Sequence, residues 1–329
     1  MKTIMKWGRP ALVVVAVLVG YQLFLVLTSR RDAANVPLGP GFDYDLDAHG
    51  GNDPAMVIAA ETVSIAIPLA VPSGIAVDAR DRIYVAGDRA IVVFAPDGTG
   101  LARHEMDASP LCLDVGDDGL LYVGFMEHLA VLTREGKKIA DWGNLGEKAA
   151  ITSVAVVDGA VFVADAGNAV VYRYDASGKQ LGRIGQKDPE REEPGFVVPS
   201  PYFDVAGGPD DTIWIVDPGR HELRNYTPDG RRRSSWKKAS MTIEGFCGCC
   251  NPTHIAIRED GSFVTSEKGF VRVKLSNEIG DLQGVVAGSD AFDEGARGLD
   301  LAVDSKDRIL VLDPGRRTVR VFELNGKED

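Results

Sequence analysis

The chain has 329 residues, 45% of them hydrophobic and 26% charged, which is enough for one large globular domain or two smaller ones. Its formal net charge of -12 argues against nucleic acid as a partner, because phosphates attract basic surfaces. The 37 glycines suit a fold of many short strands and tight turns.

The first predicted element is an uncharged apolar segment, residues 11–28. As a helix, its roughly 18 residues nearly cross a hydrocarbon core of about 30 Å. Three basic residues and the terminal amine precede this segment, and two basic residues follow it, Arg30 and Arg31. This excess of positive charge on the N-terminal side predicts a cytoplasmic N-terminus and an exported remainder. A cleaved signal peptide is the alternative, but no small-x-small cleavage site follows. We therefore predict a cytoplasmic stub and single-pass transmembrane anchor over residues 1–31, with the rest on the periplasmic or extracellular side.

The next segment, residues 32–59, has the composition of a flexible linker. Pro37, Pro40 and Pro54 interrupt it, together with several glycines, and it has no apolar periodicity. The repeats described next occupy the third predicted region, residues 60–329.

One unit recurs six times in this third region. Its first copy has β-rich runs at residues 72–78, 81–85 and 91–94, followed by the turn Pro-Asp-Gly at 96–98. Short runs separated by Asp and Gly turns predict consecutive antiparallel strands. The period of roughly 40 to 50 residues is typical of propeller blades. The sequence therefore predicts an all-β, six-bladed β-propeller.

The two ends of the repeat region predict how the ring closes. The last unit is short after Phe322, whereas a strand-like run at residues 62–67 precedes the first unit and belongs to none. We predict that this run supplies the outer strand of the sixth blade, which joins both ends and protects the edges.

Three stretches resemble NHL repeats, the blades of one propeller family. They are Asp-Ala-Gly-Asn at 165–168, Asp-Pro-Gly-Arg at 217–220 and Asp-Pro-Gly-Arg at 313–316, each just before an apolar run. The resemblance covers nearly everything after residue 60. It implies the fold but no single function, because such propellers serve as lyases, hydrolases and docking surfaces.

Residues 251–257, Asn-Pro-Thr-His-Ile-Ala-Ile, are also similar to strands of peptidyl-hydroxyglycine amidating lyase, a six-bladed NHL propeller. That resemblance implies zinc held by histidines at the channel. Only His254 here matches such a ligand, so the three-histidine set of the lyase is not reproduced.

The innermost strand of each blade lines the channel of a propeller, so the residues that begin these strands converge at one end of it. We call these places the mouth positions. Alignment of the six units predicts that the mouth positions are occupied by Gly74, Cys112, Ser153, Tyr202, His254 and Asp300.

Three further cysteines lie just before His254, in the run Phe-Cys-Gly-Cys-Cys-Asn at residues 246–251. Thiolates and imidazole suit zinc, copper or iron, and several thiolates suit an iron–sulfur cluster. We predict a transition-metal or iron–sulfur centre, with Ser153, Tyr202 and Asp300 beside it at the channel mouth. Its predicted ligands are Cys112, Cys247, Cys249, Cys250 and His254. A redox-active or vicinal disulfide, or purely structural cysteines, are the alternatives.

The leading functional hypothesis is a membrane-tethered extracytoplasmic propeller that binds this centre and serves, with a protein partner, in a redox or assembly system. A metal-dependent enzyme of the lyase or lactonase class is the second hypothesis. An interaction scaffold with structural disulfides is the third.

Overall fold

The computed structural model describes residues 53–191 and 193–326, which all lie in the compact unit Leu46–Asp329. The predicted anchor over residues 11–28 and most of the predicted linker lie outside the described residues. Within the described ranges, no helix is long and apolar enough to cross a membrane.

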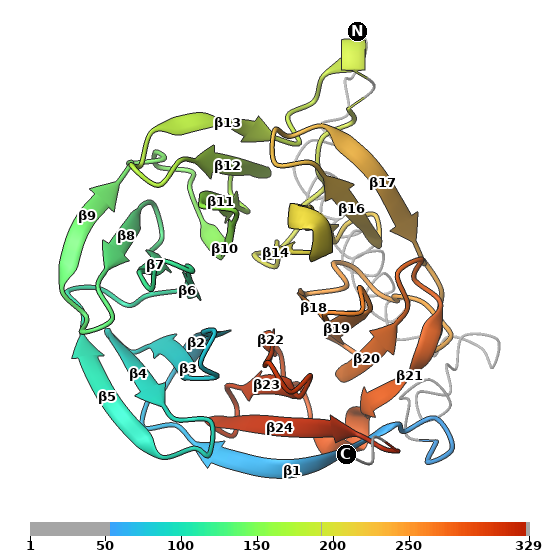
Figure 1. Cartoon of the computed structure of the whole chain (residues 1–329). Helices are drawn as coiled ribbons and strands as arrows, with labels where there is room; N and C mark the ends of the chain where they lie inside the picture. Colours follow the sequence, from blue (N-terminus) through green and yellow to red (C-terminus); the bar gives the residue numbers. More distant parts are fainter. Residues whose placement is uncertain (1–52, 192, 327–329) are drawn as a thin grey trace, which may run out of the picture. The chain divides into compact units, whose positions relative to one another are not determined.

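The described residues form six four-stranded antiparallel sheets, arranged as the blades of a ring (Figure 1). This confirms the predicted six-bladed propeller. Blade 1 consists of β2 (Pro72–Val77), β3 (Ile83–Gly87), β4 (Ala90–Phe94) and β5 (Gly100–Glu105). Blade 2 consists of β6 (Cys112–Val115), β7 (Leu121–Gly124), β8 (Leu129–Leu132) and β9 (Lys138–Trp142). Blade 3 consists of β10 (Ile151–Val157), β11 (Ala160–Asp165), β12 (Val170–Tyr174) and β13 (Gln180–Ile184).

Blades 4 to 6 follow the same plan, except that the last takes one strand from the start of the domain. Blade 4 consists of β14 (Val205–Gly207), β15 (Ile213–Asp217), β16 (Glu222–Tyr226) and β17 (Arg232–Lys237). Blade 5 consists of β18 (His254–Ile257), β19 (Phe263–Glu267), β20 (Arg272–Ser276) and β21 (Leu282–Ala287). Blade 6 consists of β22 (Leu301–Val303), β23 (Ile309–Asp313), β24 (Thr318–Leu324) and β1 (Ala59–Ala66).

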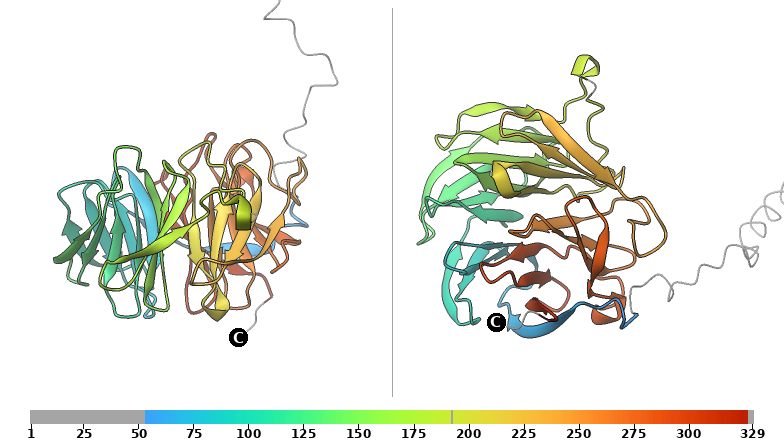
Figure 2. Two further views of the ribbon diagram at one scale, coloured as in Figure 1. Left: turned by 90° about the horizontal axis from the view of Figure 1, so that it is seen from above. Right: turned by 45° about the vertical axis from the view of Figure 1, so that its right-hand side comes forward.

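The core lies between neighbouring blades, and Figure 2 shows the ring edge-on as a thick disc. In blade 1 the two middle strands, β3 and β4, are buried along their whole length, because one face packs against blade 6 and the other against blade 2. The outer strand β5 is exposed along nearly its whole length and ends in Arg103, His104 and Glu105.

The ring closes as predicted from the unassigned run at residues 62–67. Strand β1 pairs with β24 in antiparallel register, with Ile65 opposite Val319. The Arg320 guanidinium reinforces the pair through an ion pair of 2.6 Å with Glu61. Ile65 also packs against the blade 1 turn at Gly98, where an added Cβ would lie 2.9 Å from the Ile65 side chain.

We predict that replacing Ile65→Ala lowers the free energy of unfolding by about 2–5 kcal/mol, because a buried aliphatic side chain is lost at the junction of the first and last blades. Ser64→Ala, on the exposed side of the same strand, is the matched control. Chemical denaturation of both variants measures the difference. Equal stability of the two variants would contradict the closure described above.

Candidate functional site at the channel mouth

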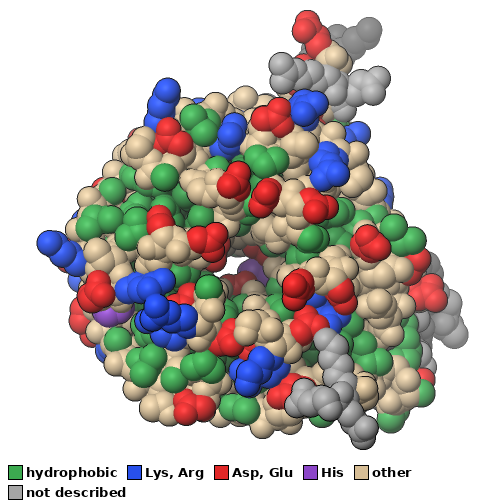
Figure 3. Space-filling model, in the orientation of Figure 1, with side chains coloured by type: hydrophobic (Ala, Val, Ile, Leu, Met, Phe, Trp, Pro, Cys, Tyr) green, Lys and Arg blue, Asp and Glu red, His purple; other side chains and the backbone are tan. Residues whose placement is uncertain are grey.

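The innermost strands β2, β6, β10, β14, β18 and β22 surround a central channel. Figure 3 shows the channel as an opening in one face of the molecule. The channel contains a cavity of about 190 Å³, lined largely by small aliphatic residues. Three carboxylates interrupt this apolar lining, those of Asp114, Asp204 and Asp300.

Backbone pairing identifies the mouth position in each blade. In blade 6 the carbonyl of Asp300 accepts a hydrogen bond from Leu312 N, and in blade 4 the carbonyl of Asp204 accepts the equivalent bond from Val216 N. Asp204 therefore occupies the mouth position that the sequence alignment assigned to Tyr202, two residues earlier. The six mouth residues are Gly74, Cys112, Ser153, Asp204, His254 and Asp300.

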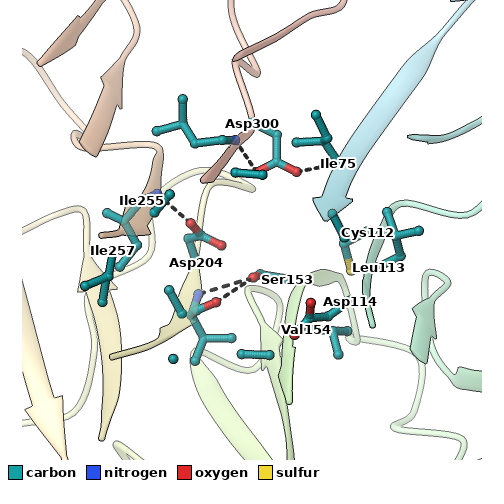
Figure 4. A pocket seen from close by; sticks show the side chains of 18 of the residues that line it. Ile75, Cys112, Leu113, Asp114, Ser153, Val154, Asp204, Ile255, Ile257 and Asp300 are labelled. Carbon is teal, nitrogen blue, oxygen red and sulfur yellow. Dashed lines mark hydrogen bonds between the residues drawn. The ribbon is translucent and has the colours of Figure 1, made fainter. Parts of the chain in front are cut away.

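Two of the mouth carboxylates join one blade to the next. Asp300 Oδ2 accepts a hydrogen bond of 2.9 Å from Ile75 N, across the junction of blades 6 and 1. Asp204 Oδ2 accepts one of 2.7 Å from Ile255 N, across the junction of blades 4 and 5. Both bonds are visible in Figure 4. Each carboxylate thus satisfies a backbone N–H on the free edge of the next inner strand.

Ser153 and Asp114 make the same kind of bridge. Ser153 Oγ accepts from Val205 N and donates to Val205 O, both at 3.2 Å, which links blades 3 and 4. Asp114 Oδ2 accepts a bond of 2.8 Å from Val156 N in blade 3. Asp114 stands two residues below the mouth position of blade 2. The other five blades carry alanine at that level, namely Ala76, Ala155, Ala206, Ala256 and Ala302.

Burial dominates the electrostatics of the channel. It raises the pKa values of Asp114, Asp204 and Asp300 to about 6 each, because a charged carboxylate loses its hydration there. The imidazole of His254 opposes this effect at Asp204. The three groups therefore take up protons in a weakly acidic range, well above the usual range for aspartate.

His254 begins β18 and is half-buried at the mouth. Its buried Nδ1 has no hydrogen-bond partner among the described residues. Burial lowers the pKa of His254, and the carboxylate of Asp204 partly restores it. The Tyr202 ring meets the imidazole edge-on at 5.9 Å, and the Lys268 ammonium lies 5.2 Å from the centre of the Tyr202 ring. The mouth thus combines a neutral base with a phenol, an ammonium and two carboxylates.

The predicted ligand Cys112 is a buried channel residue. Its sulfur lies near Ile151 and Val154, in the apolar space between blades 2 and 3. Burial, together with the carboxylate of Asp300, raises the pKa of the Cys112 thiol well above its ordinary value. Cys112 is therefore held as a neutral thiol.

The other predicted cysteine ligands lie elsewhere, in the connection between β17 and β18. Cys247 is close to the charged groups of Glu267, Arg272 and Lys274 in blade 5, whereas Cys112 packs between blades 2 and 3. All four cysteines are free thiols. Among the described residues, no group of three or more His, Cys, Asp or Glu side chains is placed to hold a metal ion. This geometry gives no support to one shared centre, which stays a prediction.

No protein-family model and no curated protein matches the chain. Similar solved structures include a streptogramin B lyase, with 10% identity and a TM-score of 0.58 over 81% of this chain and 97% of that one. The virginiamycin B lyase from Staphylococcus aureus has 12% identity and a TM-score of 0.56 over 81% and 99% of the two chains. The gluconolactonase XC5397 from Xanthomonas campestris has 15% identity and a TM-score of 0.57 over 80% and 98%.

At these identities the likeness establishes the fold alone. The chain is a six-bladed β-propeller that resembles lyase and gluconolactonase propellers. Membership of the NHL family stays a prediction.

We predict that Asp204 makes stability depend on pH. Its pKa is raised to about 6 in the folded state, so the folded state binds the proton more tightly than the unfolded chain does. The contribution of Asp204 to stability is therefore greatest below about pH 4 and falls as the pH rises towards 6, by about 3 kcal/mol at most. Asp204→Asn keeps an oxygen for Ile255 N but cannot titrate.

The measurement is chemical denaturation of the wild type and Asp204→Asn across this range of pH. Wild-type stability should fall relative to that of the variant as the pH rises from about 4 to about 6, and the difference should level off above that. A difference between the two proteins that does not change with pH would contradict the raised pKa.

Proposed function

We propose that the channel mouth is the acid–base site of an enzyme, with His254 as the base that takes a proton from a small polar substrate. The observation that carries this proposal is the imidazole itself. It stands half-buried at the mouth, its Nδ1 has no hydrogen-bond partner in the part of the chain that the structure describes, and a neighbouring carboxylate favours its protonated form. A base that is neutral near pH 7 and gains a stabilised proton suits general acid–base catalysis.

The neighbouring side chains indicate the class of reaction in which this base would act. Proton removal from carbon or from water leaves negative charge on a substrate oxygen, which a nearby cation or hydroxyl group stabilises. Lys268 and Tyr202 supply these groups on the side of the mouth next to His254. Asp204 stabilises the imidazolium that forms, because its negative charge partly offsets the lowering of the His254 pKa by burial. This set fits an elimination or the opening of a cyclic ester.

The similar structures favour the same two reaction classes. They include streptogramin B and virginiamycin B lyases and a gluconolactonase. One of them is a catalytically inactive histidine-to-alanine variant of virginiamycin B lyase with quinupristin. We propose the corresponding catalytic use of a histidine for His254.

A metal-dependent form of this chemistry needs several free oxygen ligands on the axis. The three channel carboxylates each accept a backbone N–H, and no described group of side chains is arranged as a metal site. We therefore derive no step through a metal. An iron–sulfur cluster or a zinc, copper or iron centre on the predicted cysteines stays a separate prediction.

The location of the enzyme is part of the proposal. We propose that the apolar run at residues 11–28 anchors it in the membrane and places the propeller outside the cytoplasm, where a protein partner would meet it. In fractionated cells, the protein should stay with membranes through salt and carbonate washes and be cut by protease added from outside. Recovery of a soluble protein shortened by about 30 residues would favour a cleaved signal peptide instead.

We predict that the purified protein turns over a cyclic ester, with quinupristin and glucono-δ-lactone as the two probes. His254→Ala should lower kcat/KM by about 10²–10⁴, the usual contribution of a positioned base. His128→Ala, on the β7–β8 connection, is the control and should retain wild-type activity. Turnover that is equal in wild type and His254→Ala would contradict the role of the imidazole.

A further inference from the structure

The segment from Cys247 to Cys250 is held rigidly at both ends. On one side, Phe246 is buried, stacks on Trp236 and pairs through its backbone with Lys238. On the other side, the Asn251 side chain donates to Cys247 O at 2.7 Å and accepts from Lys268 N at 2.9 Å. The three thiols between these fixed residues therefore occupy defined places.

Only one of the three thiols can meet a macromolecule. Cys249 is exposed, whereas Cys247 and Cys250 are 6% and 1% exposed. All three are unbonded. A thiol must reach a disulfide in order to attack it, so the accessible Cys249 is the only attacking group this loop offers.

Chain geometry then selects the second thiol. Cys250 is adjacent to Cys249, and adjacent Cα atoms lie about 3.8 Å apart across a trans peptide. Disulfide-bonded Cα atoms are usually about 4.4–6.8 Å apart, so the adjacent pair is too close for an unstrained bond. Cys247 is separated from Cys249 by Gly248, which has φ +70° and open space where a Cβ would lie. Cα atoms two residues apart lie at most about 7 Å apart, so a bend at Gly248 can bring Cys247 and Cys249 within the usual range.

The surroundings of Cys247 suit the resolving thiol, which reacts only after Cys249 has formed a mixed disulfide. Cys247 is buried, so a partner protein can reach it only through Cys249. Arg272 and Lys274 both donate to the carbonyl of Gly245, at 3.2 Å and 2.7 Å, two residues before Cys247. Glu267, which binds both cations at 2.8 Å, fixes these groups in place.

We propose that the loop Cys247–Cys250 is a thiol–disulfide exchange site that takes up a disulfide from a partner protein, separately from the chemistry at His254. The Cys249 thiolate attacks the partner disulfide, forming a mixed disulfide and releasing one partner thiolate, which takes up the proton that Cys249 has lost. Cys247 then attacks the Cys249 sulfur, forms the Cys247–Cys249 bond and releases the second partner thiol. The partner is reduced by two electrons, and the two protons of the loop thiols end on its two sulfurs.

The test uses the reduced full-length protein and oxidised glutathione as the disulfide. The reaction is quenched by alkylation, and bonded cysteines are mapped by mass spectrometry. We expect a Cys247–Cys249 disulfide in the wild type. Cys249→Ser should slow thiol loss by about tenfold or more, because only buried thiols remain. Cys247→Ser should stop at a stable glutathione adduct on Cys249. Cys112→Ser is the control and should leave rate and product unchanged.

Three outcomes would overturn the proposal. One is a wild-type rate no faster than that of Cys249→Ser, with both proteins melting alike. Another is a Cys247–Cys250 bond as the product. The third is a wild-type loop that resists glutathione until a chelator is added, which would favour the predicted metal centre instead. None of these results depends on turnover at His254.

Discussion

The channel depends on one recurring interaction, in which a side chain of one blade binds a backbone amide on the inner strand of the next. Each inner strand has a hydrogen-bonded neighbour on one side only, so its other edge presents N–H groups to the axis. A buried N–H without a partner is costly. Asp300, Asp114 and Asp204 supply that partner to blades 1, 3 and 5, respectively. Ser153 supplies it to blade 4.

This arrangement couples architecture to chemistry. The bonds that hold the blades together place three carboxylates in a cavity of about 190 Å³, where burial raises their pKa values. One of them, Asp204, also favours the charged form of His254. The proposed base therefore owes its electrostatic setting to a residue that serves the junction of blades 4 and 5. Substitutions at Asp204 should affect both the stability of the ring and the behaviour of the imidazole.

Much of the fold could be predicted from the sequence, because each blade repeats the same apolar runs and turns. The closing strand could also be predicted, since one strand was missing at the end and one was unassigned at the start. The mouth residue of blade 4 could not. Strand β14 is only three residues long, and the prolines at 199 and 201 leave no strand pattern from which to count. The count therefore reached Tyr202 instead of Asp204.

The candidate site shows two other limits of sequence patterns. The role of Asp114 as an acceptor for Val156 N could not be predicted. The residue stands alone between Leu113 and Val115, and this pattern does not indicate which neighbouring strand it contacts. The cysteine loop precedes His254 in the chain, and the shared centre with Cys112 that this closeness led us to expect stays a prediction. Proximity in sequence does not specify which interblade space a side chain enters. Cys247 lies beside Arg272 and Lys274, whereas Cys112 packs between blades 2 and 3.

Amide hydrogen exchange at Ile255 tests the interblade bond most directly. In the wild type, Ile255 N–H should exchange slowly, as the paired amides of β18 do, because Asp204 accepts its hydrogen bond. In Asp204→Ala, exchange at Ile255 should accelerate selectively, while Ile75, which is bound by Asp300, stays protected. Equal protection of Ile255 in both proteins would contradict the account of how the blades are joined.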